Sequence, residues 1–169
     1  MNNKIGRIAV GAGLAVLAAC AVAQDVKPVG LSVRAGLFMP TDSNTRAGGS
    51  GWFSAGVEYK VMDRMTMSGA MDQVTVSLDF ASRNNFRIVP LLVNYVHHLQ
   101  NFYVTAGVGV SFSRRPVGLG VEDRARFGYQ LGIGHDFQTA QFPLFVEAKF
   151  FGNERAELNG FGAYVGVRF

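Results

Sequence analysis

The sequence of 169 residues has little charge, a single cysteine and no long apolar run after its first 25 positions. Charged residues make up 17% of the chain, against about 25% in an average soluble protein. Hydrophobic residues make up 49%, so the chain has ample apolar surface to bury, which excludes intrinsic disorder. The lack of a later run of about 18 apolar residues excludes a transmembrane helix there. Such a chain is either a compact all-β secreted protein or a membrane β-barrel.

The N-terminal segment has the pattern of an export signal. Lys4 and Arg7 are followed by the apolar and small residues 8–19, and Ala21-Val22-Ala23 supplies an A-x-A cleavage site. We therefore expect residues 1–23 to be a signal peptide and residues 24–169 to form one barrel domain.

Cys20, the only cysteine, leaves a second interpretation of this segment open. Leu17-Ala18-Ala19-Cys20 resembles the lipobox of bacterial lipoproteins, in which Cys20 would be lipidated. Cleavage after Ala23 would instead leave the mature protein without cysteine, which excludes a disulfide framework. That protein would carry 14 basic and 12 acidic residues. A net charge this small gives no reason to expect nucleic-acid binding.

From about residue 29 onward, apolar residues recur at every second position. In Phe102–Ser113 the even positions are apolar and the odd positions are small or polar, apart from Tyr103. This alternation is typical of a strand between two environments. It predicts strands near residues 29–39, 52–61, 64–73, 86–98, 101–113, 125–137, 142–151 and 160–169. The weakest are the third and the fourth. The third could continue unevenly to Phe80, because a parity shift near Gln73 suggests a bulge or the start of a loop, and the fourth contains Pro90.

The predicted connections alternate between short and long. The short ones are Met62-Asp63, Leu99-Gln100 and Gln138–Gln141, and the longer polar ones are residues 40–51, 74–85, 114–124 and 152–159. Short turns at one end and longer loops at the other are typical of outer-membrane barrels. An even number of strands would place both termini on the periplasmic side.

Aromatic residues at both ends of the apolar face favour a membrane barrel over a soluble one. The pairs are Phe102 with Phe112, Phe127 with Phe137, Phe161 with Phe169, and Phe53 with Tyr59. Ten tilted strand residues span roughly 25 Å, which matches the height of a lipid-facing band.

The opposite face carries charged and polar residues in the strand interiors. They are Arg34, Glu58, Lys60, Arg126, Gln130, Glu147, Lys149 and Arg168. The lumen of an eight-stranded barrel is filled by side chains, and buried charges must be paired. These residues therefore predict an ion-pair network inside the barrel.

The C-terminal strands of the chain resemble those of a known family. The odd positions from Phe161 to Phe169 are all apolar, which resembles the C-terminal signal read by the barrel-assembly machinery. Residues 103–110, 128–134 and 144–148 are similar to the last strands of the small opacity-type and OmpA/OmpX-type porin-like barrel superfamily. The resemblance extends over the mature chain. It implies an all-β, eight-stranded antiparallel up-and-down transmembrane β-barrel in the bacterial outer membrane, in contact with lipid and lipopolysaccharide.

Some small outer-membrane barrels are enzymes, but the histidines do not fit the known lipid-cleaving kind. His97, His98 and His135 all map to the short-turn rim, and a His-x-Ser-Asn arrangement is absent. Adjacent strand residues point to opposite faces, so His97 and His98 cannot easily share a metal with Asp136. The sequence predicts no catalytic, metal-binding or cofactor-binding residues and no cofactor.

Two short glycine patterns could be mistaken for phosphate-binding loops. Gly107-x-Gly109 and Gly132-x-Gly134 lie within predicted strands, and no helix follows either of them. We interpret them as lumen positions that lack room for a side chain.

The polar loops are the remaining candidates for function. Arginines near Thr41–Arg46 and Ser113–Arg124 could pair with lipopolysaccharide phosphates, or could belong to solvated loops. We expect a monomeric, non-enzymatic barrel with a role in envelope structure or surface interaction. The alternatives are a narrow channel for small solutes and a soluble periplasmic barrel that binds a lipophilic ligand.

Overall fold

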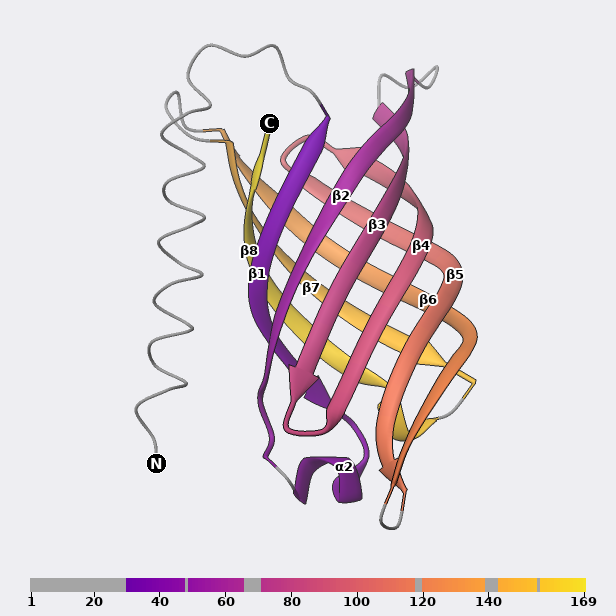
Figure 1. Ribbon diagram of the computed structural model, residues 1–169. Coiled ribbons are helices and arrows are strands. Elements are labelled where there is room, and N and C mark those ends of the chain that lie inside the picture. The colour runs from indigo at the N-terminus through magenta and orange to yellow at the C-terminus, as the bar shows by residue number, and fades with distance from the viewer. Residues whose placement is uncertain (1–29, 48, 66–70, 118–119, 139–142, 155) are drawn as a thin grey trace.

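The computed structural model describes residues 30–47, 49–65, 71–117, 120–138, 143–154 and 156–169. The predicted signal peptide and Cys20 lie outside these residues. The described chain forms a closed antiparallel barrel of eight strands, in which sequence neighbours pair and β1 closes onto β8 (Figure 1). The predicted strand number and up-and-down order are confirmed.

The strands differ in length, and two short helices lie in the connections. The strands are β1 (Leu31–Pro40), β2 (Trp52–Met65), β3 (Met71–Arg83), β4 (Phe86–Leu99), β5 (Phe102–Val117), β6 (Gly120–Gln138), β7 (Pro143–Asn153) and β8 (Gly160–Arg168). The helices among the described residues are α2 (Ser43–Ala47) and the 3-10 helix η2 (Ala156–Leu158). Neither helix has the length and apolar character needed to cross a membrane.

The predicted third strand, near residues 64–73, is wrong. β2 continues through the predicted turn at Met62-Asp63 to Met65, and β3 begins at Met71. The bulge also lies in β2, because the β2–β3 register shifts between Lys60 and Met62 and leaves Val61 as an extra residue. β3 itself alternates regularly, so the parity shift predicted near Gln73 is not there.

The predicted long loop at about residues 74–85 is also wrong. The alternative of a third strand that continues to Phe80 is nearer the structure, because β3 runs to Arg83. Only Asn84 and Asn85 connect β3 to β4. Asn84 has a φ of 51°, in the left-handed region that asparagine tolerates better than most residues. A two-residue turn of this kind keeps the hairpin tight.

Pro90 lies within β4 without changing its register. The β3–β4 pairing keeps the same offset on both sides of Pro90, with Leu91 opposite Leu78 and Ile88 opposite Ala81. The two intervening positions are missing from that ladder, as expected beside a residue without an N–H group. Pro90 remains in register with Ser111 of β5.

The predicted loop at residues 114–124 is a β-hairpin that extends the barrel wall. β5 and β6 stay paired to Val117 and Gly120. The pairing of β4 with β5 stops at Arg114, and the pairing of β7 with β6 stops at Gly128. The hairpin therefore projects past its neighbours at the end that also carries α2 (Figure 1). We call this end the loop end. The opposite end, with the start of β1 and the C-terminus, is the terminal end.

Side chains alternate between the lumen and the exterior as predicted. On β5 the apolar set from Phe102 to Phe112 is exposed on the outside, whereas Tyr103, Thr105 and Ser111 are buried. Gly107 and Gly109 share that inward face, and a Cβ on Gly109 would overlap the carbonyl oxygen of Leu91. The interpretation of these glycines as lumen positions without room is confirmed.

Candidate functional site

Arg34 is the centre of an ion-pair network inside the barrel. Its guanidinium donates two hydrogen bonds to Asp79, of 2.8 and 2.7 Å, and one of 2.6 Å to Glu58. A Glu147 carboxylate oxygen lies 3.6 Å from the same guanidinium. These four residues come from β1, β3, β2 and β7, and Arg34 is 1% exposed. A buried charge needs such compensation, because each ion loses its hydration on burial.

Lys149 completes the network from β7. Its ammonium lies 3.3 Å from a Glu147 carboxylate oxygen and 3.9 Å from a Glu58 carboxylate oxygen. Two cations therefore face three carboxylates, those of Glu58, Asp79 and Glu147. These ion pairs connect five residues from four strands at the middle of the barrel.

A ladder of neutral polar groups lies next to the ions. The Asn94 side chain donates to Thr75 at 3.2 Å and to Ser77 at 3.0 Å, and its amide oxygen accepts from Gln130 at 2.5 Å. All four residues are buried. These four polar side chains from β3, β4 and β6 therefore hydrogen-bond to one another inside the barrel.

An apolar cluster fills the lumen on the loop-end side of the ions. It contains Phe38, Trp52, Ala81, Ile88, Leu92, Phe151 and Leu158. Trp52 is 1% exposed, with its ring centroid 5.6 Å from that of Phe38 and 5.7 Å from that of Phe86. Leu158 reaches the cluster from η2, so the β7–β8 connection folds back over the mouth of the barrel.

Hydrogen bonds connect the segments around the loop-end mouth. Thr45 of α2 donates to the Glu157 carbonyl at 3.0 Å, and the Thr41 N–H donates to the Asn159 carbonyl at 2.8 Å. Arg115 of β5 donates to the Glu157 carboxylate at 2.6 Å. The connections therefore form one bonded cap over the apolar cluster rather than separate loops.

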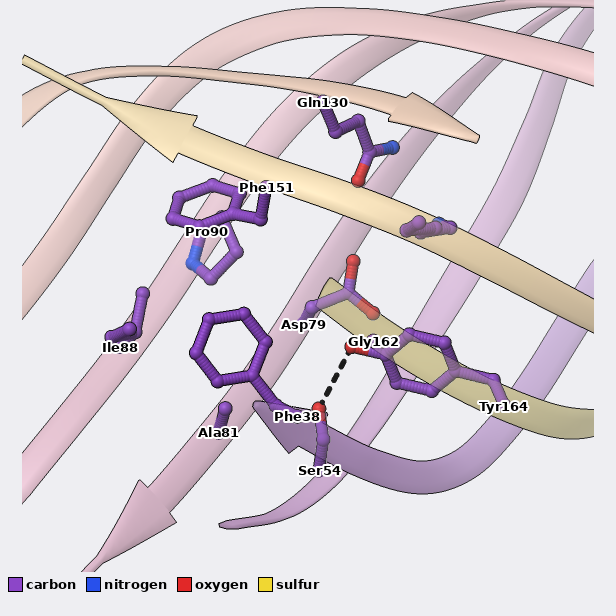
Figure 2. A pocket seen from close by; sticks show the side chains of 11 residues that line it. Phe38, Ser54, Asp79, Ala81, Ile88, Pro90, Gln130, Phe151, Gly162 and Tyr164 are labelled. Carbon is purple, nitrogen blue, oxygen red and sulfur yellow. Dashed lines mark hydrogen bonds between the residues drawn. The ribbon is translucent and has the colours of Figure 1, made fainter. Parts of the chain in front are cut away.

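The space left between the cap and the ions is small. A cavity of about 20 Å³ lies among residues such as Ile88, Pro90 and Phe151, room for about one water molecule. Figure 2 shows Ser54 and Tyr164 joined across it by a hydrogen bond of 3.0 Å. At this level the lining side chains leave little space inside the described part of the barrel.

A second group of charged and aromatic side chains lies at the terminal end. The Arg168 guanidinium lies 4.8 Å from the Tyr103 ring centroid and 4.5 Å from that of Phe145, and it donates to Asp136 at 2.9 Å. His98 Nε2 is 3.7 Å from the other Asp136 carboxylate oxygen. The lumen beside this group opens into a recess of about 120 Å³, bordered by Lys60 and Arg168 among others.

The histidines occupy the terminal end, as predicted, and point in different directions. His97 Nδ1 lies 2.6 Å from Asp72, whereas His98 stacks on Tyr103 in the lumen. His135 packs on the outside between Phe102 and Phe137, with centroids at 4.6 and 4.8 Å. Among the described residues, no three His, Cys, Asp or Glu side chains are grouped in a way that could hold a metal ion.

The exterior carries a continuous apolar surface over all eight strands. Its exposed side chains include Leu37, Val57, Tyr59, Leu78, Phe80, Leu91, Val93, Tyr95, Phe102, Val104, Val108, Val110, Phe112, Phe127, Leu131, Ile133, Phe137, Val146, Phe161 and Val165. A soluble monomer rarely exposes an apolar patch of more than a few hundred Å². An apolar outside around a polar, charged inside is the inverse of a soluble barrel and matches a transmembrane one.

Every charged or polar residue predicted for the lumen lies on the inward face. Arg34, Glu58, Gln130, Glu147 and Lys149 are buried, and the other three lie nearer the barrel ends. The prediction missed Asp79, the main partner of Arg34, because residues 74–85 were interpreted as a loop. The alternation of Thr75, Ser77 and Asp79 with apolar neighbours is the signal that could have revealed it.

Comparison with solved structures supports the fold. The N-terminal β-barrel domain of Pseudomonas aeruginosa OprF superposes with a TM-score of 0.52 at 13% identity, covering 85% of this chain and 98% of that one. The fold is that of a small outer-membrane β-barrel. The Yersinia pestis outer membrane protein Ail matches with a TM-score of 0.46 at 9% identity, covering 82% and 98%. No protein-family model and no curated protein matches the sequence.

The exterior and the fold together locate the protein. Closed antiparallel barrels with an apolar outer band span the outer membrane of bacteria. The protein is an outer-membrane β-barrel, and the soluble lipid-binding alternative does not fit its apolar outside.

Proposed function

We propose that this protein is a non-enzymatic barrel with a closed lumen, which contributes to the structure of the envelope or to interactions at the cell surface. The observation that carries the proposal is the filled lumen, with the Arg34 network in the middle and the Trp52 cluster beneath the cap. The termini would face the periplasm, and the loop end would face the exterior. The monomeric state expected from the sequence is part of the proposal.

The channel alternative is tested by conductance. Protein refolded into a planar lipid bilayer should give no steady single-channel steps, because the cavity beside Tyr164 has room for about one water molecule. A porin inserted by the same procedure is the positive control. Regular steps that scale with the amount of folded protein would show that the lumen opens and would overturn the closed-lumen proposal.

The export and assembly of the chain form part of the same proposal. Residues 1–23 act as the signal peptide, and the strand ending at Phe169 is read by the barrel-assembly machinery. Replacement of Phe169 by Ser should lower the amount of heat-modifiable barrel in the outer membrane. Val165→Ser, on the same strand face, is the matched control, because it removes apolar surface without changing the terminal residue.

The projecting hairpin can separate the two proposed roles. A surface interaction would require the hairpin, whereas a structural role in the envelope would not. Residues 116–121 can be replaced by an Asn-Gly turn, because Arg115 and Glu122 are already paired across the hairpin and the contact of Arg115 with Glu157 is kept. In a strain that lacks the protein, detergent sensitivity would be measured after complementation. Rescue by both the full and the shortened chain supports a structural role, whereas rescue by the full chain alone supports a surface interaction.

A further inference from the structure

A groove of about 300 Å³ lies on the outside of the barrel, where β4, β5 and β6 reach the loop end. Val89, Phe112 and Ala125 contribute apolar surface, and Arg87, Asp123 and Arg124 contribute charge. Arg87 and Phe112 are exposed, whereas their sequence neighbours Ile88 and Ser111 are buried in the lumen. The groove therefore faces the surroundings of the barrel and is separate from the lumen network.

The groove lies where the apolar band gives way to charged residues. Phe112 and Phe127 are the last exposed aromatic side chains of β5 and β6 before the hairpin projects. Beyond them come Arg114 and Asp123, whose cross-strand pair is solvent-exposed. This boundary is the level at which lipid headgroups meet the hydrocarbon region around a barrel.

Arg87, one of the arginines of the groove, makes no close ion pair among the described residues, and its charge acts on Asp123 only at longer range. Asp123 receives two hydrogen bonds of 2.6 Å from Arg114, and Arg124 pairs with Glu122. None of the ion pairs among the described residues includes Arg87. The lining has two arginines and one aspartate, so its net charge is positive. A guanidinium above an apolar floor suits a phosphate that is attached to a hydrocarbon chain.

We propose that this groove binds the phosphate-bearing headgroup of an anionic lipid, with Arg87 as the principal donor and the acyl chain running over Val89 and Phe112. The inference rests on the proposed membrane-embedded function. It adds a specific lipid contact to a barrel that would otherwise meet lipid only through its apolar band. A free anion is a poorer occupant, because the apolar floor offers it nothing.

The test measures how strongly the refolded protein selects an anionic lipid. Spin-labelled phosphatidylglycerol and phosphatidylcholine would be compared in phosphatidylcholine vesicles, from the fraction of label that the protein immobilises. The unaltered protein should prefer phosphatidylglycerol. Arg87→Gln should lower that preference about fivefold, the effect of removing one charge-assisted contact. Asp123→Asn should raise it, because it removes the negative charge of the groove and frees Arg114.

Arg46→Gln is the matched control, because Arg46 lies in α2 and bonds the Thr41 carbonyl rather than lining the groove. Equal effects of Arg87→Gln and Arg46→Gln, or a lower preference in Asp123→Asn, would overturn the proposal. Inorganic phosphate should displace no more label than chloride at equal ionic strength, and greater displacement would show a free-anion site instead. Heat-modifiable migration is measured on every sample. Its absence in the unaltered protein would contradict the membrane-barrel function itself rather than the groove.

Discussion

The two faces of the barrel wall obey different physical rules. On the outer face, Val104, Val108 and Val110 are exposed and pack against no particular partner in the barrel, so we expect one apolar side chain to replace another with little consequence. On the inner face, Arg34 and Asp79 need one another's exact charge and position, and Gly109 has no space for a single methyl group. The outer face therefore requires only that each residue be apolar, whereas the lumen requires particular residues that pair with one another. Substitutions on each face can show whether it follows its own rule.

The largest effect is expected in the lumen, from Arg34→Met. The change leaves Glu58, Asp79 and Glu147 facing Lys149 alone, and loss of one partner from a buried ion network costs about 3–5 kcal/mol. The free energy of unfolding from vesicles can be followed by the emission of Trp52, the single tryptophan. Arg34→Lys keeps the charge and should lose less. If Arg34→Met lowers the free energy of unfolding by less than about 1 kcal/mol, the ion network stabilises the barrel no more than apolar side chains of similar size would.

The next effect belongs to the outer face. Val108 is 54% exposed at the middle of β5, and an arginine at mid-bilayer on the lipid side of a barrel costs about 2–4 kcal/mol. Val108→Arg should lower the free energy of unfolding by that amount, whereas Val108→Leu should leave it nearly unchanged. If Val108→Arg is as stable as the unaltered protein in the same vesicles, this face does not contact lipid.

Gly109→Ala tests whether size alone matters in the lumen. The added Cβ would overlap the Leu91 carbonyl oxygen on the neighbouring strand, and overpacking of this kind costs about 1–3 kcal/mol. Ala106→Gly, on the outer face of β5, changes the same group in the reverse direction and controls for backbone effects. Equal stability of Gly109→Ala and the unaltered protein would show that β4 can move to make room.

The smallest effect is expected in the projecting hairpin, which extends beyond its paired neighbours β4 and β7. The Arg114 guanidinium, through its hydrogen bonds, holds the pKa of Asp123 below the ordinary value. A carboxylate with a lowered pKa stabilises the fold at higher pH, and this contribution is lost as the pH falls below about 4. Amide-exchange protection in residues 114–117 should therefore decrease in acid while the barrel wall stays protected. Asp123→Asn should remove most of this pH dependence.

The sequence predicts the wall better than the connections, for a physical reason. Alternation repeats over many residues, so the strands around Phe102–Phe112 and at the C-terminal end were predicted to within a few positions. Val61 is a single extra residue, and one insertion reverses the parity of everything after it. Polar residues such as Arg114 and Asp123 were interpreted as a loop, although cross-strand ion pairs stabilise them as strand. The partners of Arg34 lie on three other strands, which no local pattern can specify.

The seam between β1 and β8 has a consequence for the timing of assembly. Every other ladder joins strands that follow one another in the chain, so those hairpins can form from local segments. The seam pairs Ser32 with Arg168 and Pro40 with Gly160, and contacts between such distant residues carry the highest entropic cost of closure. Until the last strand is in place, the curled sheet has two free edges. We therefore expect a chain that stalls before β8 to be the form most exposed to aggregation and proteolysis.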